Sequence, residues 1–198
     1  MVAILPGSRD REVERNLKLM LAAAGIVHAK HPDTRFLVAA FKTQHADRAR
    51  EMLADSRLPV TVAVRKTPEI LQAADCCIAV SGSVSLEMMN ALKPAVIVYR
   101  AGWLGVTVAR RIMQVKFITL VNLLAGRAVY PEFLCFRDPP EAIAAEIDNW
   151  LSNLDIRDGT VEALKAIKAE VAQPGAAARA AEFILSRVGG AIASRRAA

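Results

Sequence analysis

The 198-residue sequence predicts an α/β fold in which helices cover both faces of a parallel sheet, a doubly wound arrangement, followed by C-terminal helices. Three observations support this fold class. Short apolar runs rich in Val and Ile recur up to about residue 120. Segments whose apolar residues have helical spacing separate these runs. The runs are apolar on both faces instead of alternating with polar residues, so the sheet is expected to be covered on both sides.

The strand candidates are the apolar runs that end at turn residues. They are 2–5, 36–39, 60–64, 76–80, 95–99 and 117–120. Helices are expected between them at about 10–30, 44–53, 67–73, 83–92 and 103–113. The first helix has the clearest pattern, because Val13, Leu17, Met20, Leu21 and Ala24 recur at helical spacing. Thr67-Pro68 supplies a cap residue and a proline suited to the first helical position.

Beyond about Pro139 the sequence predicts helices only, at 141–153, 160–172 and from 176 to about 188. Pro174-Gly175 separates the last two. We therefore expect a sheet domain at 1–138, C-terminal helices at 139–188 and a disordered tail at 189–198.

Composition and charge exclude several functional classes. The chain has 26 Lys and Arg against 20 Asp and Glu, which favours an anionic partner. Aromatic residues are scarce and the positive charge is spread without a recognition motif, so nucleic-acid binding is not expected. No apolar run approaches the ~20 residues of a membrane span. The three Cys form no CxxC pair and no framework typical of secreted proteins, so we expect a reducing compartment. The three His show no metal-ligand spacing with Cys or acidic residues, so no metal is expected. The adjacent Cys76 and Cys77 are expected on opposite sides of a strand.

Two strand ends carry small-residue turns that suit a phosphate. Ligands of doubly wound sheets bind outside the carboxyl ends of the strands, and two ends here continue into Gly7-Ser8 and Ser81-Gly82-Ser83. Glycine allows close backbone approach, and the N–H groups of the following helix face the anion. Arg9 can add a forked guanidinium contact. Either turn alone also fits an ordinary strand-to-helix connection, but the two together with Arg9 favour phosphate binding.

Glu87 lies four residues after Ser83, one turn into an expected helix. A carboxylate there can accept two hydrogen bonds from a ribose diol. The position equally suits a solvated glutamate that stabilises the helix dipole. The spacing alone leaves both interpretations open.

Two later segments are unusual. Asn122-Leu-Leu-Ala-Gly126-Arg127 follows the last expected strand, where loops often complete a site, although the residues alone favour a helix turn with a glycine C-cap. Residues 100–116 combine four cations and no acid with apolar residues. That pattern suits an anionic membrane or lipid headgroup, but a surface helix with a solvated charged side is the commoner case.

Together, four blocks resemble lipid-A-disaccharide synthase, a family of GT-B glycosyltransferases. The blocks are Leu5-Pro-Gly-Ser-Arg9 with Glu12, Ser81-Gly-Ser-Val-Ser-Leu-Glu87, Pro94-Ala-Val-Ile-Val-Tyr-Arg100, and Asn122-Leu-Leu-Ala-Gly-Arg127 with Pro131-Glu132. They occur in the family's order and close to its spacing over nearly the whole chain. Many GT-B enzymes share the second block. The resemblance implies the Rossmann-like C-terminal domain of a GT-B enzyme.

The resemblance also implies a reaction. It is the inverting transfer of 2,3-diacylglucosamine from UDP-2,3-diacylglucosamine to 2,3-diacylglucosamine 1-phosphate (lipid X). The products are lipid A disaccharide 1-phosphate and UDP, in the biosynthesis of lipid A and lipopolysaccharide. No metal or cofactor is implied, because basic loops and helix N-termini neutralise the leaving diphosphate. The implied location is cytoplasmic, peripheral at the inner face of the cytoplasmic membrane.

Carried over position by position, the resemblance implies a set of substrate-binding residues. They are Gly7, Ser8, Arg9, Ser81, Gly82, Ser83, Glu87, Asn122, Gly126, Arg127 and Glu132. Arg9 and the Ser81 turn are expected at the diphosphate and Glu87 at the ribose hydroxyls. The 122–127 block is expected to complete the donor pocket with Glu132 nearby. Glu12 matches an acidic position without an assigned role, and the uracil is expected near the loop after Val64.

The chain departs from the family pattern in two ways. Cys135 stands where the family usually has Gln, and a thiol cannot make the paired hydrogen bonds of an amide. The second departure is length, because only the donor-binding, C-terminal half of a GT-B enzyme has a counterpart here. The acceptor site and general base are expected on the N-terminal half, so this chain alone is expected to bind UDP-sugar weakly and transfer nothing.

Because only half of a GT-B enzyme has a counterpart here, we expect the C-terminal helices to have a packing partner, and two alternative functions stay open. The C-terminal helices are expected to pack on the sheet domain, on a separate N-terminal half, or on a second copy by helix exchange in a homodimer. One alternative function is another UDP-sugar GT-B transferase or epimerase, against which the 122–127 block speaks. The other is a non-catalytic module that binds a nucleotide or a partner.

Overall fold

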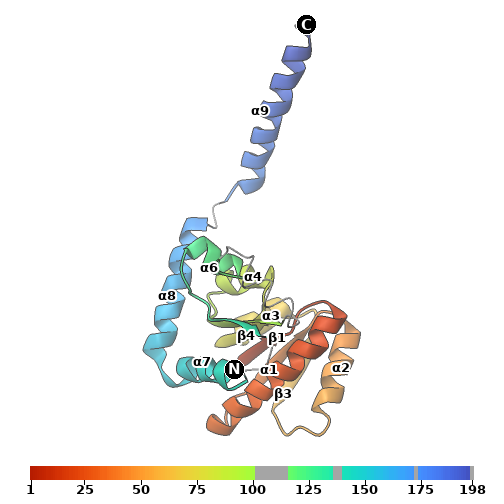
Figure 1. The fold of residues 1–198 in the computed structure, drawn as a ribbon, viewed down its shortest axis with the longest axis vertical. Helices are drawn as coiled ribbons and strands as arrows, with labels where there is room; N and C mark the ends of the chain where they lie inside the picture. The colour runs from red at the N-terminus through yellow and green to blue at the C-terminus, as the bar shows by residue number, and fades with distance from the viewer. Residues whose placement is uncertain (101–115, 136–139, 172–173, 197–198) are drawn as a thin grey trace.

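A parallel six-stranded sheet forms the centre of the structure, a computed structural model that describes residues 1–100, 116–135, 140–171 and 174–196 (Figure 1). The strand order is β3-β2-β1-β4-β5-β6. The strands are β1 (Val2–Leu5), β2 (Phe36–Ala40), β3 (Val60–Val64), β4 (Cys76–Val80), β5 (Ala95–Arg100) and β6 (Glu132–Cys135). The order reverses between β1 and β4, which is the switch point where doubly wound sheets bind ligands.

Helices cover both faces of this sheet (Figure 1). The described helices are α1 (Asp10–Lys30), α2 (Thr43–Leu53), α3 (Thr67–Ala73), α4 (Val84–Asn90), α6 (Leu120–Ala125), α7 (Pro140–Ser152), α8 (Leu154–Val171) and α9 (Ala176–Arg196). The sequence-based prediction of an α/β doubly wound fold is confirmed. The first five predicted strands are also confirmed, each with its ends within one residue.

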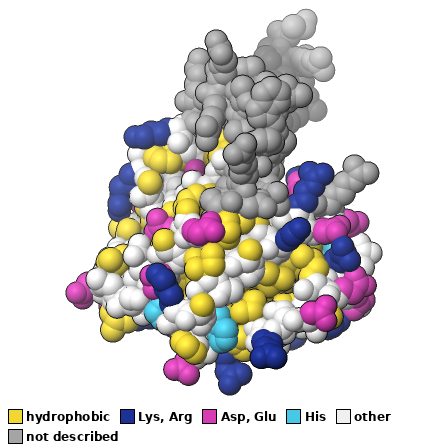
Figure 2. Space-filling view, turned by 60° about the horizontal axis from the view of Figure 1, so that its bottom comes forward, with side chains coloured by type: hydrophobic (Ala, Val, Ile, Leu, Met, Phe, Trp, Pro, Cys, Tyr) yellow, Lys and Arg dark blue, Asp and Glu magenta, His cyan; other side chains and the backbone are white. Residues whose placement is uncertain are grey.

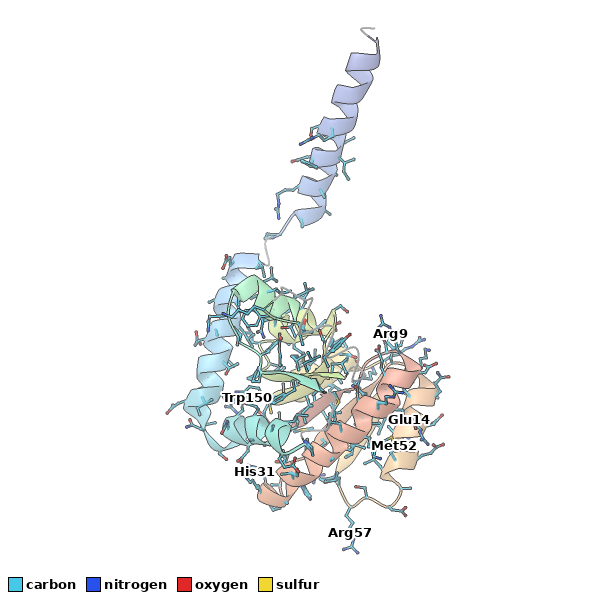
Figure 3. All side chains as sticks on the ribbon, viewed as in Figure 1. Arg9, Glu14, His31, Met52, Arg57 and Trp150 are labelled. Carbon is cyan, nitrogen blue, oxygen red and sulfur yellow. The ribbon has the colours of Figure 1, made fainter. Side chains whose placement is uncertain are left out.

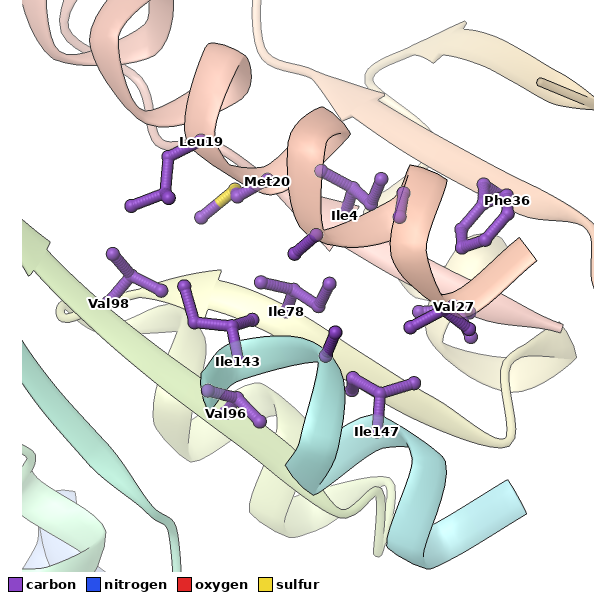
Figure 4. Packing of buried hydrophobic residues seen from close by; sticks show 14 of the residues in the cluster. Ile4, Leu19, Met20, Val27, Phe36, Ile78, Val96, Val98, Ile143 and Ile147 are labelled. Carbon is purple, nitrogen blue, oxygen red and sulfur yellow. The ribbon is translucent and has the colours of Figure 1, made fainter. Parts of the chain in front are cut away.

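Two hydrophobic cores lie on opposite faces of the sheet because successive strand residues point to opposite sides. On one face α1 and α7 pack over the strands, and Figure 4 shows Met20 of α1 and Ile143 of α7 meeting Ile78. On the other face the buried residues come from α3, α4, α6 and α8, and include Met88 and Leu164. The strands β1 and β4, whose ends carry the turns at 7–8 and 81–83, are therefore packed on both faces.

The cysteines of β4 illustrate this alternation. Cys76 belongs to the core under α1 and α7, and Cys77 to the opposite core, so the expectation that they point to opposite sides is confirmed. Burial raises the pKa of Cys76 to about 12 and raises that of Cys77 well above its usual value. Both thiols therefore stay protonated and serve as packing residues.

The strand predicted at 117–120 is wrong. Thr119 instead caps α6, and its Oγ1 accepts a hydrogen bond from the backbone N–H of Asn122 at 3.2 Å. The sixth strand is β6, which pairs with β5. A short apolar run fits a strand and a buried helix turn equally well, and here the threonine cap decides for the helix. The helix expected at 103–113 lies outside the described residues.

The first two C-terminal helices pack on the sheet domain. α7 lies along α1, where Asp148 accepts hydrogen bonds from Lys30 Nζ at 2.9 Å and from His31 Nε2 at 2.7 Å. The Lys30 bond, followed by the His31 bond, lowers the pKa of Asp148 to about 2. Leu164 and Ile167 of α8 are buried in the opposite core. α8 begins at Leu154, earlier than the predicted residue 160.

The last helix, α9, extends away from the rest of the molecule (Figure 1). It continues to Arg196, beyond the predicted end near residue 188 and into the predicted tail. Phe183, Ile184 and Leu185 on it are exposed. Among the described residues, no helix is long and apolar enough to cross a membrane.

Candidate functional site

A cleft of about 370 Å³ opens at the carboxyl ends of β1, β2 and β4. Residues from three strand ends, three connections and three helices surround it. Its lining residues are Leu5, Gly7, Ser8, Arg9, Glu12, Ala39, Phe41, Thr67, Val80, Ser81, Gly82, Ser83, Val84 and Glu87. The structure therefore brings both predicted turns, Arg9 and Glu87 together at the switch point of the sheet.

Gly7 is required by the geometry of the first turn. Its φ is +106°, a conformation that L side chains rarely adopt, and an added Cβ would lie 3.3 Å from Val80 Cγ2. Glycine thus lets the β1–α1 turn lie against the end of β4. Gly82 in the second turn faces open space, so the fold itself does not require glycine there.

Arg9 lies at the N-terminal end of α1 (Figure 3). Its Nη1 donates to Glu12 Oε1 at 3.0 Å, and both side chains are exposed. An exposed ion pair of this kind contributes little to stability. The guanidinium is therefore free to exchange the carboxylate for an anion bound in the cleft, next to the N–H groups of the first turn of α1.

Asp10 ties the first turn to α2. Its Oδ1 accepts hydrogen bonds from Lys42 Nζ at 3.1 Å, Gln44 Nε2 at 2.9 Å and His45 Nε2 at 2.8 Å. The His45 bond, followed by the Lys42 bond, lowers the pKa of Asp10 to about 2. The carboxylate is therefore ionised at neutral pH, where it cannot act as a proton donor, and its hydrogen bonds hold it beside α2.

The second turn presents hydroxyl groups and a carboxylate to the cleft. Ser81 Oγ donates to Ile118 O at 3.5 Å, and Ser83 is exposed. Within the described structure, Ser83 makes no capping hydrogen bond through its side chain. Glu87 is exposed in the first turn of α4. This is the position from which a carboxylate could meet a diol held in the cleft.

The predicted residues of the 122–132 block lie beside the cleft and not in its described lining. Asn122 is fully buried: its Nδ2 donates to Tyr130 O at 2.8 Å and Glu132 Oε1 at 2.7 Å. Its Oδ1 accepts from the N–H groups of Val129 and Tyr130, each at 2.9 Å. The amide is thus fully occupied inside the protein.

Glu132 is occupied in the same network. It accepts from Ile118 N at 2.7 Å, and its Oε1 accepts from Thr119 N at 2.9 Å and Thr119 Oγ1 at 2.7 Å. Together Asn122 and Glu132 fasten the 118–119 loop, which Ser81 touches, to the start of β6. In this structure both side chains hold the loop beside the cleft.

Gly126 and Arg127 follow the same helix. Gly126 is the C-cap of α6 in the left-handed conformation, with φ +64°, which confirms the interpretation of a helix turn with a glycine C-cap. Arg127 is exposed next to it. Neither residue belongs to the described lining of the cleft.

Sequence reasoning missed Phe41 and Thr67 as lining residues. Both follow the ends of strands, β2 and β3, whose carboxyl ends share the edge with β1. Their positions after predicted strands could have placed them at this edge of the sheet, but neither Phe nor Thr indicates a ligand by itself. Among the described residues, no group of three or more His, Cys, Asp or Glu is placed to hold a metal ion.

Comparison with known proteins identifies the family. The family model described as lipid-A-disaccharide synthetase matches residues 1–184. The chain belongs to this family. Lipid-A-disaccharide synthases of Anaeromyxobacter sp. (strain K), Thiobacillus denitrificans and Myxococcus xanthus are 37%, 35% and 33% identical to it, each over 93% of this chain. Those matches cover 48–49% of the relatives, so the chain spans about half the length of the curated relatives it matches.

Solved structures show that this synthetase-family chain has the GT-B type of α/β fold. S. aureus TarM, solved with fondaparinux, alpha-GlcNAc-glycerol and UDP, matches 86% of this chain and 32% of its own with a TM-score of 0.60 at 12% identity. The pneumococcal O-GlcNAc transferase GtfA, solved with UDP and GlcNAc, matches 84% of this chain and 32% of its own with a TM-score of 0.55 at 13% identity. At such low identity these likenesses concern the fold alone.

Proposed function

We propose that this chain is the donor-binding half of a lipid-A-disaccharide synthase and that its cleft binds UDP-2,3-diacylglucosamine. One observation carries the proposal: in a member of this family, Arg9, the Ser81–Ser83 turn and Glu87 converge on one cleft at the switch point. The two solved structures of the same fold were obtained with UDP, which agrees with a nucleotide ligand.

The proposed binding mode follows from the chemistry of the lining. The diphosphate lies between Arg9, the N–H groups of α1 and the hydroxyl groups of the Ser81 turn. Glu87 accepts hydrogen bonds from the ribose hydroxyls. The uracil lies toward Thr67 and Phe41, on the β2–β3 side of the cleft.

The proposed reaction is an inverting displacement. The acceptor hydroxyl of lipid X forms a bond to C1 of the donor sugar while the bond from C1 to the diphosphate breaks. The proton of that hydroxyl passes to a general base expected on the N-terminal half. Arg9 and the α1 N-terminus stabilise the charge that develops on UDP, which requires no metal.

The further proposals concern partners and location. Transfer needs an N-terminal half, and α9, whose apolar residues are exposed, is the proposed element for packing on that half or for exchange within a homodimer. The site of action is the cytoplasmic face of the inner membrane, where the acylated substrates reside. Arg127 and Gly126 remain predicted donor-pocket residues, and Asn122 and Glu132 are proposed to shape that pocket indirectly.

A thermal-shift titration tests the binding proposal. UDP should raise the melting temperature, and adenosine diphosphate and uridine should do so less, because a ligand of the folded state contributes about 2.7 kcal/mol at a hundredfold excess over its Kd. Arg9→Ala and Glu87→Ala should abolish the shift. Arg50→Ala is the matched control, since Arg50 forms a similar exposed pair with Asp47 on α2. An unchanged UDP shift in both cleft variants would refute the proposed site.

Transfer is tested separately. The chain is mixed with the N-terminal half of the Anaeromyxobacter relative and supplied with both lipid substrates. Formation of the disaccharide only in the mixture supports the proposed division of labour. A mixture that binds UDP but transfers nothing would favour the alternative of a nucleotide-binding module without catalysis.

A further inference from the structure

Helix α6 has an unusual distribution of polarity. Val121 and the polar Asn122 are fully buried, whereas Leu120, Leu123 and Leu124 are 48%, 41% and 47% exposed. Residues three and four apart share one face of a helix. The three leucines therefore form a single outward face, which we call the leucine face.

The inward side of α6 leaves little freedom to rotate the helix. Asn122 makes four hydrogen bonds through its side chain, and Val121 lies in the core with Met88 and Leu164. Turning the leucines inward would break that network. A polar residue held inside and three leucines held outside indicate a surface that serves an apolar environment beyond this chain.

Two exposed cations flank the leucine face along the chain. Lys116 precedes α6 and Arg127 follows it, and both are exposed. Between Glu87 and Glu132 the sequence contains six Lys or Arg and no Asp or Glu. On the face shown in Figure 2, the coloured basic and acidic side chains are interspersed. An apolar face between cations complements a surface that is apolar inside and anionic outside.

We propose that the leucine face docks on an anionic lipid surface, with Leu120, Leu123 and Leu124 entering the acyl region and Lys116 and Arg127 contacting the headgroups. The inference rests on the proposed membrane association and names the surface responsible for it. Ser81 of the cleft touches Ile118, two residues before α6. Docking here therefore holds the cleft next to the membrane, where an acylated sugar enters.

Vesicle co-sedimentation of the full chain tests the proposal. Vesicles of phosphatidylethanolamine with phosphatidylglycerol should bind the protein, and pure phosphatidylcholine vesicles should bind it much less. The triple variant Leu120→Ser, Leu123→Ser, Leu124→Ser should lose roughly tenfold or more in partitioning. Circular dichroism and the melting temperature verify that the variant is folded.

The chain offers a matched control. Leu154 and Ile156 are 59% and 47% exposed, but they lie beside the acidic Asp155 and Asp158. Leu154→Ser with Ile156→Ser should leave vesicle binding unchanged. Lys116→Gln with Arg127→Gln should weaken binding to anionic vesicles and leave the weak binding to neutral vesicles unchanged.

Three outcomes would overturn the proposal. The first is a folded triple variant that binds vesicles like the unmodified chain. The second is that binding depends on α9 instead and is lost in Phe183→Ser, Ile184→Ser, Leu185→Ser. The third is that the leucine face proves to contact protein, so that the triple variant loses association with a second copy or an N-terminal half while vesicle binding persists. The UDP titration is run on the triple leucine variant, where an unchanged UDP shift separates this test from that of the proposed function.

Discussion

Replacing Asn122 by Ala should destabilise the fold strongly without any ligand present. The substitution removes four hydrogen bonds of 2.7–2.9 Å from a fully buried side chain. It leaves the N–H groups of Val129 and Tyr130 and the carbonyl of Tyr130 without this partner. At about 1–3 kcal/mol for each unsatisfied buried group, partly relieved by relaxation, the expected loss is about 3–5 kcal/mol in the free energy of unfolding.

Urea unfolding of the chain measures this loss. Asn149→Ala is the matched control: Asn149 is exposed on α7, and its replacement should change the unfolding free energy by less than about 0.5 kcal/mol. Our reasoning would be refuted by a loss below about 1 kcal/mol at an unchanged m-value. If such a variant had nevertheless lost UDP binding, Asn122 would be a ligand contact, as the family resemblance implies, and not a positioning residue.

Three further predictions follow from single residues. Gly7→Ala should lower the free energy of unfolding in urea by about 1–3 kcal/mol, because φ +106° and the 3.3 Å approach to Val80 strain any side chain. Gly82→Ala should leave that free energy unchanged and weaken only UDP binding. Equal losses of stability in the two variants would contradict this prediction. Glu12→Gln should tighten UDP binding a few-fold in calorimetry by releasing Arg9, and weaker binding would instead make Glu12 part of the site. Asp148, with a pKa lowered from 3.8 to about 2, stabilises the folded state above the higher value and loses that contribution as the pH falls toward the lower one. The melting temperature of Asp148→Asn should therefore vary less than that of the unmodified chain between these pH values.

Much of the fold was readable from local pattern. Five strands and the helices between β1 and β5 followed from apolar runs, helical spacing and prolines, because a sheet buried on both faces leaves continuous hydrophobic segments. The cap expected at Thr67 is wrong, because α3 begins at Thr67 and its N-cap is Lys66. The cleft was also anticipated: parallel strands end at the same edge, so the turns after Leu5 and Val80 had to meet if β1 and β4 were neighbours.

The wrong strand prediction has a physical cause. The run 117–120 contains too few residues to distinguish a strand from a buried helix turn, and the cap at Thr119 acts through a hydrogen bond that periodicity does not reveal. The donor-pocket roles of Asn122 and Glu132 stay predictions that rest on the resemblance. Buried hydrogen bonding and ligand contact select the same residue types, so the sequence does not distinguish the two roles. The hydrogen bonds of both residues support an indirect role, which the Asn122→Ala variant tests.

Phe41 and α6 illustrate a second limit. Phe41 follows a strand as many surface residues do, and only the cleft gives it a possible role. The leucines of α6 resemble core residues in the sequence, and their exposure depends on Asn122 being held on the inner side. Tertiary contacts bury the polar residue and expose the leucines of this helix, and hydrophobic periodicity alone does not predict that arrangement.

The central claim is that the cleft between β1 and β4 binds the donor nucleotide. A crystal structure of this chain with UDP tests it most directly. The account predicts the diphosphate against Arg9 and the N-terminus of α1, the ribose hydroxyls on Glu87 and the base toward Thr67. UDP bound at another surface, or bound here with its diphosphate away from Arg9, would contradict the account.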